Sequence, residues 1–310
     1  MLLRQFPDIQ WLKRKIRDDF GDKTAVNNTA LKHNGWPTVV LNAAVKHTDR
    51  RDIKGPFSLF FNQQGQSQVM VQGRQYTINE QCYGLSNAGE YYNLLIDQPQ
   101  PTETLNLHFG QHFFEQSVEA LSRSHEALLD NPFFTRSQEF NLSTGTRPRN
   151  AAINTLLTRL LASYQSENEA EAEEEVLFSL LSLVLTAHSQ EIARTASLPL
   201  KSPSTRQEIG RRLMTARELL HSHYNQPVSL DTLSEASCLS KFHFLRLFKQ
   251  QFGQTPYQYQ KQLRLERAIT LYRQGLSLDA IAPLVGMENG SSVSRMFLKH
   301  TGVYPSQLKQ

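Results

Sequence analysis

A short segment in the C-terminal third of the chain combines cations with large apolar side chains at helical spacing. Between Lys241 and Gln251, the positions of Phe244, Leu247 and Phe248 predict one buried face of a helix. The opposite face carries three cations and two large apolar groups: Lys241, Phe242, Leu245, Arg246 and Lys249. Cations can contact phosphates or guanine, and apolar groups can contact thymine methyls. This face therefore has the chemistry of a helix that reads the major groove of DNA.

A second helix of this kind is expected near the C-terminus, because the sequence repeats. Ser229-Leu230-Asp231 recurs as Ser277-Leu278-Asp279, 48 residues later, and Arg246 matches Arg295 at an offset of 49. The second helix, Ser291–His300, is predicted to bury Val293, Met296 and Phe297 and to expose Ser291, Ser292, Arg295 and Lys299.

Each repeat is typical of a helix, a short turn and a second helix, at about residues 228–252 and 277–300. Ser229 and Ser240 have the residue type and the position of helix N-caps. Between the repeats, Pro256–Gln274 predicts one helix, which Thr255 would cap. A helix of about 18 residues is roughly 27 Å long, and side chains extend its reach toward the ~34 Å repeat of duplex DNA. The two reading helices could then enter successive major grooves.

The charge distribution favours a polyanionic partner for the same region. The chain holds 33 basic and 29 acidic residues, a net charge of +4, but residues 205–310 alone carry +7 and residues 1–204 carry −3. A chance difference between two solvated surfaces is the alternative explanation. Together with the repeated helix pairs and the exposed apolar groups, the charge favours DNA binding over an ordinary solvated helical domain.

The same residues resemble a known family. The segment 228–259, with Ser240-Lys-Phe-His-Phe-Leu-Arg-Leu-Phe and Gly253-Gln-Thr-Pro256, is similar to the first helix-turn-helix of the AraC/XylS transcription regulators. Arg264-Leu265, Ala268 and Leu271 resemble the linker helix of that family, and Gly286 to Pro305 resembles its second motif. Three positions depart from the family pattern, namely Met287, Val293 and Leu298, and they predict a weaker grip by the second motif.

The resemblance and the exposed faces together define a set of predicted DNA-binding residues. The resemblance implies base contacts at Phe242, Leu245 and Arg246 and at Gly290, Ser291, Ser292 and Arg295. The complete predicted set is Ser240, Lys241, Phe242, Leu245, Arg246, Lys249, Gly290, Ser291, Ser292, Arg295 and Lys299. The partner expected for it is double-stranded promoter or operator DNA.

The N-terminal part has the pattern of short strands and then of helices. Strands are expected at Val39–His47, Phe57–Phe61, Gln68–Gln72, Gln75–Ile78, Gln81–Leu85, Tyr91–Ile96 and Thr104–Phe109, with turns such as Pro99-Gln-Pro101 between them. Helices are expected at 8–20, 112–122, 150–164 and 171–194, and residues 123–149 as an irregular connection. Strands of this spacing predict an antiparallel sandwich or barrel, and the resemblance implies that the barrel is cupin-like.

The predicted fold class is therefore α+β, with an N-terminal antiparallel β-barrel and flanking helices before an all-α double helix-turn-helix domain. We expect an effector-binding and dimerisation domain at 1–195, a Pro- and Ser-rich linker at 196–205, and a DNA-binding domain at 206–310. Leu181 and Leu185 belong to a surplus of leucine that predicts a surface for a second copy of the chain.

A small-molecule effector is expected inside the barrel, because such barrels can enclose ligands. The predicted lining residues are His47, Tyr83 and Tyr92, each with a polar tip on the inward face of its strand. No metal or cofactor is expected, because the segment 87–93 lacks histidine and His108 and His112 straddle a predicted strand end. Two cysteines, Cys82 and Cys238, predict no disulfide framework.

These features predict a cytoplasmic, homodimeric transcription regulator that is not an enzyme. No signal peptide or membrane-spanning run is expected, and no nucleophile or phosphate-loop motif is present. RNA polymerase is a further expected partner, whereas activation and repression stay open. Two alternatives also stay open: a cupin-type metal enzyme fused to a DNA-binding domain, and a regulator whose barrel only dimerises.

Overall fold

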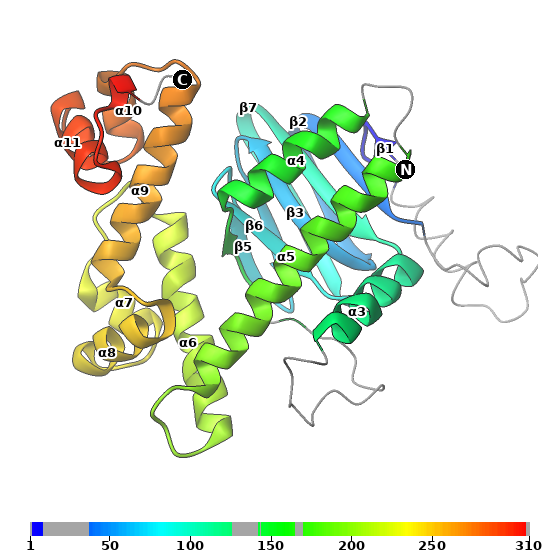
Figure 1. The fold of residues 1–310 in the computed structure, drawn as a ribbon, viewed down its shortest axis with the longest axis horizontal. Coiled ribbons are helices and arrows are strands. Elements are labelled where there is room, and N and C mark those ends of the chain that lie inside the picture. Colours follow the sequence, from blue (N-terminus) through cyan, green and yellow to red (C-terminus); the bar gives the residue numbers. More distant parts are fainter. Residues whose placement is uncertain (1, 9–36, 126–141, 143, 165–169, 308–310) are drawn as a thin grey trace, which may run out of the picture. The chain divides into compact units, whose positions relative to one another are not determined.

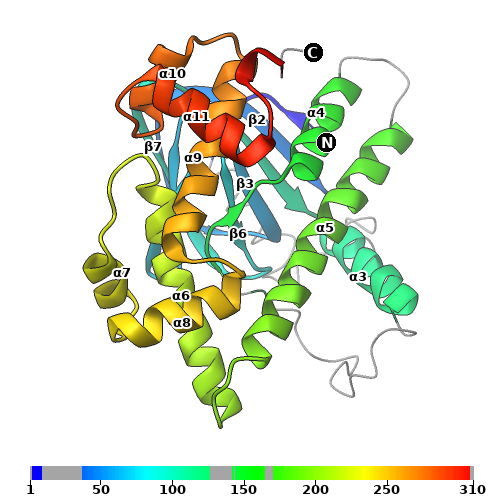
Figure 2. The same cartoon turned by 60° about the vertical axis from the view of Figure 1, so that its left-hand side comes forward.

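The computed structural model describes residues 2–8, 37–125, 142, 144–164 and 170–307, which form two compact units. The N-terminal unit is Met1–His188 and the C-terminal unit is Ser189–Gln310. The predicted helix at 8–20 and most of the connection at 123–149 lie outside the described residues. The first unit is a sheet with helices on one face, and the second is all-helical (Figures 1 and 2). This confirms the predicted α+β class.

The N-terminal unit is built around one long central strand, β7. It pairs with β2 on one side, and on the other side with β4 near its start and with β3 near its end. The order is β1-β2-β7-β3-β6-β8, with the β4–β5 hairpin attached to β7, and the pairings of the described residues do not close this sheet into a barrel. The strands are β1 (Leu2–Leu3), β2 (Val39–Lys54), β3 (Phe57–Gln64), β4 (Ser67–Val71), β5 (Arg74–Ile78), β6 (Cys82–Ser86), β7 (Tyr91–Phe109) and β8 (Arg147–Pro148).

The predicted turn at Pro99-Gln-Pro101 is wrong, because β7 continues through it. Val45 of β2 pairs with Thr102 and His47 pairs with Asp97, so the four residues 98–101 of β7 lie opposite Lys46 alone. Proline has no N–H to donate, and strands tolerate it at bulges of this kind. The same bulge marks the place where β7 changes its partner from β4 to β3.

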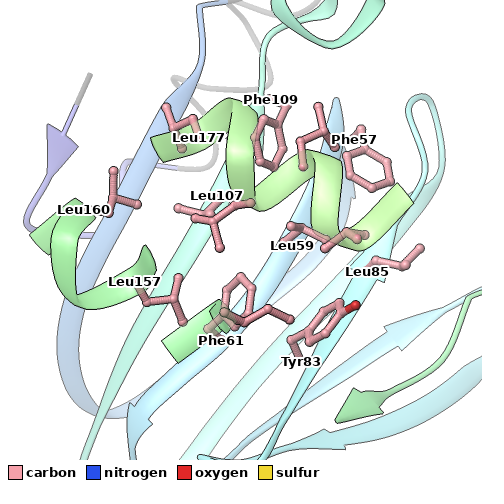
Figure 3. Packing of buried hydrophobic residues seen from close by; sticks show 14 of the residues in the cluster. Phe57, Leu59, Phe61, Tyr83, Leu85, Leu107, Phe109, Leu157, Leu160 and Leu177 are labelled. Atoms are coloured by element: carbon pink, nitrogen blue, oxygen red, sulfur yellow. The ribbon is translucent and has the colours of Figure 1, made fainter. Parts of the chain in front are cut away.

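The two faces of the sheet have different chemistry, because side chains alternate along each strand. On β7, Leu105, Leu107 and Phe109 point to the apolar core beneath the helices, whereas Thr104 and Asn106 are buried polar residues of the opposite face. Figure 3 shows the apolar core, which includes Phe57, Leu59, Phe61, Tyr83 and Leu85 from the sheet and Leu157, Leu160 and Leu177 from the helices. Each fully buried large side chain of this kind contributes about 1.5–3 kcal/mol of burial free energy.

The described helices of the N-terminal unit cover the apolar face of the sheet (Figure 1). Their bounds are α3 (Gln111–His125), α4 (Ala151–Ser163) and α5 (Ala170–Ala196). Within α5, Glu173–Ala196 is long and apolar enough to cross a membrane by length and composition, an exception to the expectation from the sequence. Leu180, Leu181 and Val184 of this helix are fully buried in the core against the sheet, whereas Ile192 near its end is 56% exposed.

Burial in that core also corrects one expectation for the dimer. Leu181 is 0% exposed and Leu185 is 6% exposed, and both belong to the intramolecular core. The leucine surplus predicted to form a partner surface is therefore largely used to cover a sheet whose inner face is rich in phenylalanine.

The C-terminal unit contains two helix-turn-helix motifs around a central helix, α9. The helices are α6 (Pro203–Ser222), α7 (Leu230–Ala236), α8 (Lys241–Phe252), α9 (Pro256–Arg273), α10 (Leu278–Leu284) and α11 (Gly290–Thr301), followed by a 3₁₀ turn at Pro305–Gln307. The predicted N-caps Ser229, Ser240 and Thr255 each accept a backbone N–H of the first turn with the side chain. Thr255 and Gln258 complete a reciprocal capping box.

Two separate apolar cores support the two motifs, and α9 contributes to both. Tyr259 and Leu263 lie in the core of the first motif, and Leu265, Ala268 and Leu271 lie in the core of the second. Figure 2 shows α9 running from the α6–α8 group to α10 and α11. These apolar residues of the helix are thus buried, and they divide between two cores.

The segment predicted as a linker carries some structure of its own. Leu198 is 2% exposed in the core of the first motif, and α6 already begins at Pro203. Proline suits the first turn of a helix because its missing N–H has no partner to lose there. The sequence predicts domain boundaries at 195 and 206, whereas the two compact units divide between His188 and Ser189. The predicted boundaries of the functional domains stay a prediction.

Candidate nucleic-acid interface

Helix α8 presents the predicted reading face to solvent. Phe244, Leu247 and Phe248 are buried, whereas the Phe242 side chain is 75% exposed and that of Leu245 is 38% exposed. Phe242 and Leu245 are two of only nine large apolar side chains that are exposed in the described part of the chain. Exposed apolar groups of this size on one helix face indicate a binding surface.

Two of the three cations on α8 are available for a ligand. Arg246 and Lys249 are exposed, and the described residues offer neither of them a hydrogen bond or an ion pair. Lys241 differs, because its ammonium pairs with the carboxylate of Asp231 at the start of α7. Both partners are more than half exposed, so this pair contributes little to stability and can open for a phosphate.

The turn between α7 and α8 sets the direction of this face. Cys238 adopts a left-handed conformation with φ of 51°, and Ser237 is fully buried with its hydroxyl donating to the Leu233 carbonyl. Ser240 accepts the N–H of His243 and so begins α8. Ser240 thus has a structural role at the N-terminus of the helix, where the free N–H groups also favour a phosphate.

Helix α11 occupies the equivalent place in the second motif, but it exposes fewer cations and no large apolar side chain. Its N-cap is Asn289, which accepts the N–H of Ser292. Ser291, Arg295 and Lys299 are exposed as predicted, whereas Ser292, also predicted to be exposed, is half-buried. Arg295 donates to the Ser292 hydroxyl over 3.2 Å. The capping role of Asn289 was missed, although asparagine directly before a glycine and a serine-rich helix start is a signal for it.

Gly290 has a different position from the other predicted residues. It is buried, and its N–H donates to a carboxylate oxygen of Asp279 over 2.9 Å. A Cβ at this position would approach that carboxylate oxygen to 2.6 Å, so a larger residue would have to displace the Asp279 side chain. Its predicted base contact is therefore restricted to its backbone, and its visible role is to let α11 begin against α10.

A buried polar pair supports the first motif from behind. His221 Nε2 lies 2.8 Å from the Tyr259 hydroxyl, which joins α6 to α9. Burial, with a further contribution from the Arg217 charge, lowers the pKa of His221 to about 3. His221 is therefore neutral in the folded protein at neutral pH.

This pKa predicts that acid destabilises the C-terminal unit. Below a pH of about 6.5 the unfolded chain binds a proton at His221 that the folded protein does not, so stability falls as the pH falls. The expected loss between pH 6.5 and pH 4 is about 3 kcal/mol from this histidine. Hydrogen exchange of peptides from α6 and α9, measured across this range, should show the loss. His221→Gln should flatten the profile, and His243→Gln, at an exposed site on α8, is the matched control. Identical profiles for wild type and His221→Gln would contradict this assignment.

The three residues predicted to line an effector pocket do not lie together. The inward placement of His47 is wrong: its side chain is 70% exposed, and Nδ1 lies 2.7 Å from Asp97 Oδ1. The bulge between Val45 and His47 interrupts the alternation on which that placement depended. Tyr83 is buried and stacks on Phe61 in the core beneath the helices.

Tyr92 lies on the other face of the sheet, in a cluster that the sequence reasoning missed. Its ring contacts Phe60 and stacks with His108 at 6.4 Å between ring centroids, and His108 Nδ1 lies 2.9 Å from the Ser58 hydroxyl. Burial, with the Arg50 charge, lowers the pKa of His108 to about 4, and burial raises the pKa of Tyr92. The alternation of Thr104, Asn106 and His108 with apolar residues was the signal for this face.

Arg50 adds a buried charge to the edge of this cluster. It is 8% exposed, its guanidinium lies 5.0 Å from the centre of the Phe6 ring, and it donates to the Pro7 carbonyl. Among the described residues, no three His, Cys, Asp or Glu side chains come close enough to hold a metal ion.

Comparisons with known proteins bear on the C-terminal unit first. Residues 233–310 match a family model described as a helix-turn-helix domain. PqrA of Proteus vulgaris, a probable transcription factor, is 31% identical over 87 residues, which cover 28% of this chain and 71% of PqrA. The chain belongs to the AraC/XylS family of transcription regulators. It is accordingly a DNA-binding transcription regulator, in a family whose members are generally not enzymes.

Two further relatives differ in how much of each chain aligns. YisR of Bacillus subtilis (strain 168), an HTH-type transcriptional regulator, is 22% identical over 82% of this chain and 85% of YisR. YbfI of the same organism is 32% identical over 36% of this chain, and the match spans only 38% of YbfI. A solved structure of apo ToxT from Vibrio cholerae aligns with 88% of this chain and 97% of ToxT, at 13% identity and a TM-score of 0.37.

Proposed function

We propose that this regulator recognises a two-part operator, with α8 reading one major groove and α11 reading another. The exposed Phe242 and Leu245 beside the unpaired cations Arg246 and Lys249 of α8 are the observation that carries the proposal, because a merely solvated helix would not present both kinds of group. The proposed base-contacting side chains are Phe242, Leu245 and Arg246 on α8 and Ser291, Ser292 and Arg295 on α11. Lys249 and Lys299 would contact phosphates.

Selection of bound duplexes from a random-sequence library tests this function directly. The selected duplex should show two conserved elements about one helical turn apart, and footprinting should protect both. Selection of duplexes without any common sequence, or footprinting protection of a single element, would contradict the proposed recognition of two elements.

The apolar side chains of α8 predict that the operator is read through thymine methyl groups. Replacing single thymines of the selected duplex by uracil removes one methyl each. At one or two positions under α8 the affinity should fall about fourfold, because a buried methyl contributes about 0.8 kcal/mol. A variant that combines Phe242→Ala with Leu245→Ala should no longer distinguish thymine from uracil there. Uracil under α11 is the matched control, since its exposed base-facing groups are serines and an arginine. Equal sensitivity in wild type and variant would show that these side chains do not contact thymine.

The N-terminal unit is proposed to bind a small-molecule effector that controls DNA binding. Supporting this, the face of the sheet away from the helices places polar side chains beside aromatic rings around Tyr92 and His108, the mixture of groups that lines small-molecule sites. Mass spectrometry of small molecules retained by the native protein, followed by thermal-shift screening, tests the proposal. Tyr92→Phe should weaken the binding of any compound that raises the unfolding temperature of the wild type. Tyr91→Phe, at a neighbouring residue that is 60% exposed, should leave that binding unchanged. A protein that responds to no compound would favour a unit that only dimerises.

A homodimer acting in the cytoplasm beside RNA polymerase is the proposed assembly. Because Leu181 and Leu185 are buried, the proposed contact surface between the two subunits consists of the partly buried Leu156, Leu161 and Leu183 on α4 and α5. Sedimentation velocity of wild type and of Leu183→Glu tests this surface, because the variant should shift the equilibrium to monomer. The runner-up, a metal enzyme fused to the DNA-binding unit, would require stoichiometric metal in the purified protein.

A further inference from the structure

One arginine on the central helix α9 joins the two motifs through their backbones. Arg264 donates from Nε to the Tyr224 carbonyl over 2.7 Å and from Nη2 to the Gln226 carbonyl over 3.0 Å. It also donates from Nη1 to the Gly286 carbonyl over 3.1 Å. Residues 224 and 226 precede α7 of the first motif, whereas Gly286 lies in the turn between α10 and α11 of the second. A single planar guanidinium therefore bonds both motifs at once.

The backbones of the two motifs also touch beside this guanidinium. A Cβ at Gly286 would lie 1.9 Å from the Asn225 carbonyl oxygen, and Gly286 has a φ of 68°, which favours glycine. No side chain can be interposed at this point. The contact thus brings the turn before α11 directly against the segment before α7.

A second side chain on α9 fixes the same segment. Gln260, one turn before Arg264, is 7% exposed and donates from Nε2 to the Gln226 carbonyl over 2.7 Å. It holds only the first motif, so it orders the carbonyls that Arg264 uses. Arg264 alone of the two reaches Gly286.

The arrangement matters for recognition because the apolar cores of the two motifs are separate. Among the described residues, the two clusters have no buried residue in common, and α9 is the helix that contributes to both. A single helix can bend and twist slightly, and each base pair of DNA advances the groove by about 3.4 Å. A second connection beside α9 is therefore needed to hold α8 and α11 in one register on the duplex.

We propose that Arg264 is a positioning residue that sets the spacing between the two operator elements, by locking the second motif against the first at Gly286. This inference rests on the proposed function, in which both α8 and α11 read bases. Arg264 contacts no base in this role and acts through the placement of α11.

Duplexes in which the selected elements are moved apart or together by one or two base pairs test the proposal. When the spacing between the two elements changes by one base pair, the affinity of the wild-type protein should fall about tenfold, the loss expected when at least one base pair is misread. Arg264→Met, similar in length but without donors, should bind the selected duplex about tenfold more weakly. Its preference for the selected spacing over a change of one base pair should fall below about threefold, while base preference within each element stays as in wild type. Arg264→Lys should restore the spacing preference only in part, because a point charge cannot bond three carbonyls in one plane.

Arg273→Met is the matched control, since Arg273 is an exposed cation on the last turn of the same helix. It should change the affinity for all spacings alike. If Arg264→Met does not fold by hydrogen exchange, Gln260→Met takes its place, with a smaller loss of spacing preference in the same direction. An unchanged spacing preference in a folded Arg264 variant would overturn the proposal. Wild-type protein that is indifferent to spacing, but still protects both elements, would overturn it as well. Protection of one element alone would instead contradict the proposed two-part function.

Discussion

Arg246→Ala is expected to lower the affinity for the selected operator by about 1–3 kcal/mol, and Arg295→Ala by less. Arg246 is exposed on α8 and its side chain has no hydrogen bond or ion pair within the described structure, so its guanidinium is available for a guanine. Arg295 already donates to Ser292, and its neighbours are serines, which discriminate poorly between base edges. Val293 and Leu298, which depart from the family pattern, are buried and half-buried, so they remove potential contacts from α11.

Competition binding against the selected duplex and against unrelated DNA measures this difference. Lys249→Ala is the matched comparison, because loss of a phosphate contact should weaken all sequences alike and reduce the salt slope by about one. Equal losses at Arg246 and Arg295, or a larger loss at Arg295, would show that the second motif reads DNA as strongly as the first.

Leu181→Glu is expected to unfold the N-terminal unit rather than to release a folded monomer. Leu181 is 0% exposed between α5 and the sheet, and a carboxylate there has no described partner of opposite charge in the core. An uncompensated buried charge costs about 3–5 kcal/mol, a large part of the stability of one domain. Thermal unfolding and the yield of soluble protein measure the effect.

Thr186→Glu supplies the control for this substitution. Thr186 is exposed on the same helix, so the same change of charge should alter stability by no more than about 0.5 kcal/mol. A Leu181→Glu protein that is folded and monomeric would show that this side chain belongs to an interface between subunits, as the leucine pattern first suggested.

Much of the C-terminal unit was predictable because its determinants are local. The bounds of α8, α9 and α11 to within one residue, the N-caps Ser229, Ser240 and Thr255, and the two faces of α8 follow from side-chain spacing within a few residues, whereas α6 was not predicted. The repeat of the helix pair supported the same prediction independently, because two segments of the chain show the same pattern. Asn289 was not predicted as a cap, because the second reading helix was predicted to begin at Ser291, one residue after its true start at Gly290.

The N-terminal sheet was predictable in its class and not in its register. The strand runs and the α+β class followed from alternation, but the continuous β7 through Pro99 and the outward side chain of His47 did not. Both depend on one bulge in the pairing of β2 with β7, between residues about fifty positions apart in the chain. A shift of register by one residue exchanges the two faces of a strand, and no local pattern reports it.

The chemistry of the reading helices, the family and the positions of the motifs can all be predicted from the sequence, because periodicity, capping and charge act over a few residues. Which residues meet across the fold is known only from the folded chain. It buried Leu181 rather than exposing it to a partner, placed Tyr83 and Tyr92 on opposite faces of the sheet, and brought Arg264 to the carbonyl of Gly286. These outcomes depend on contacts between segments far apart in the chain, whose geometry is set by packing and by backbone hydrogen bonds of the whole unit.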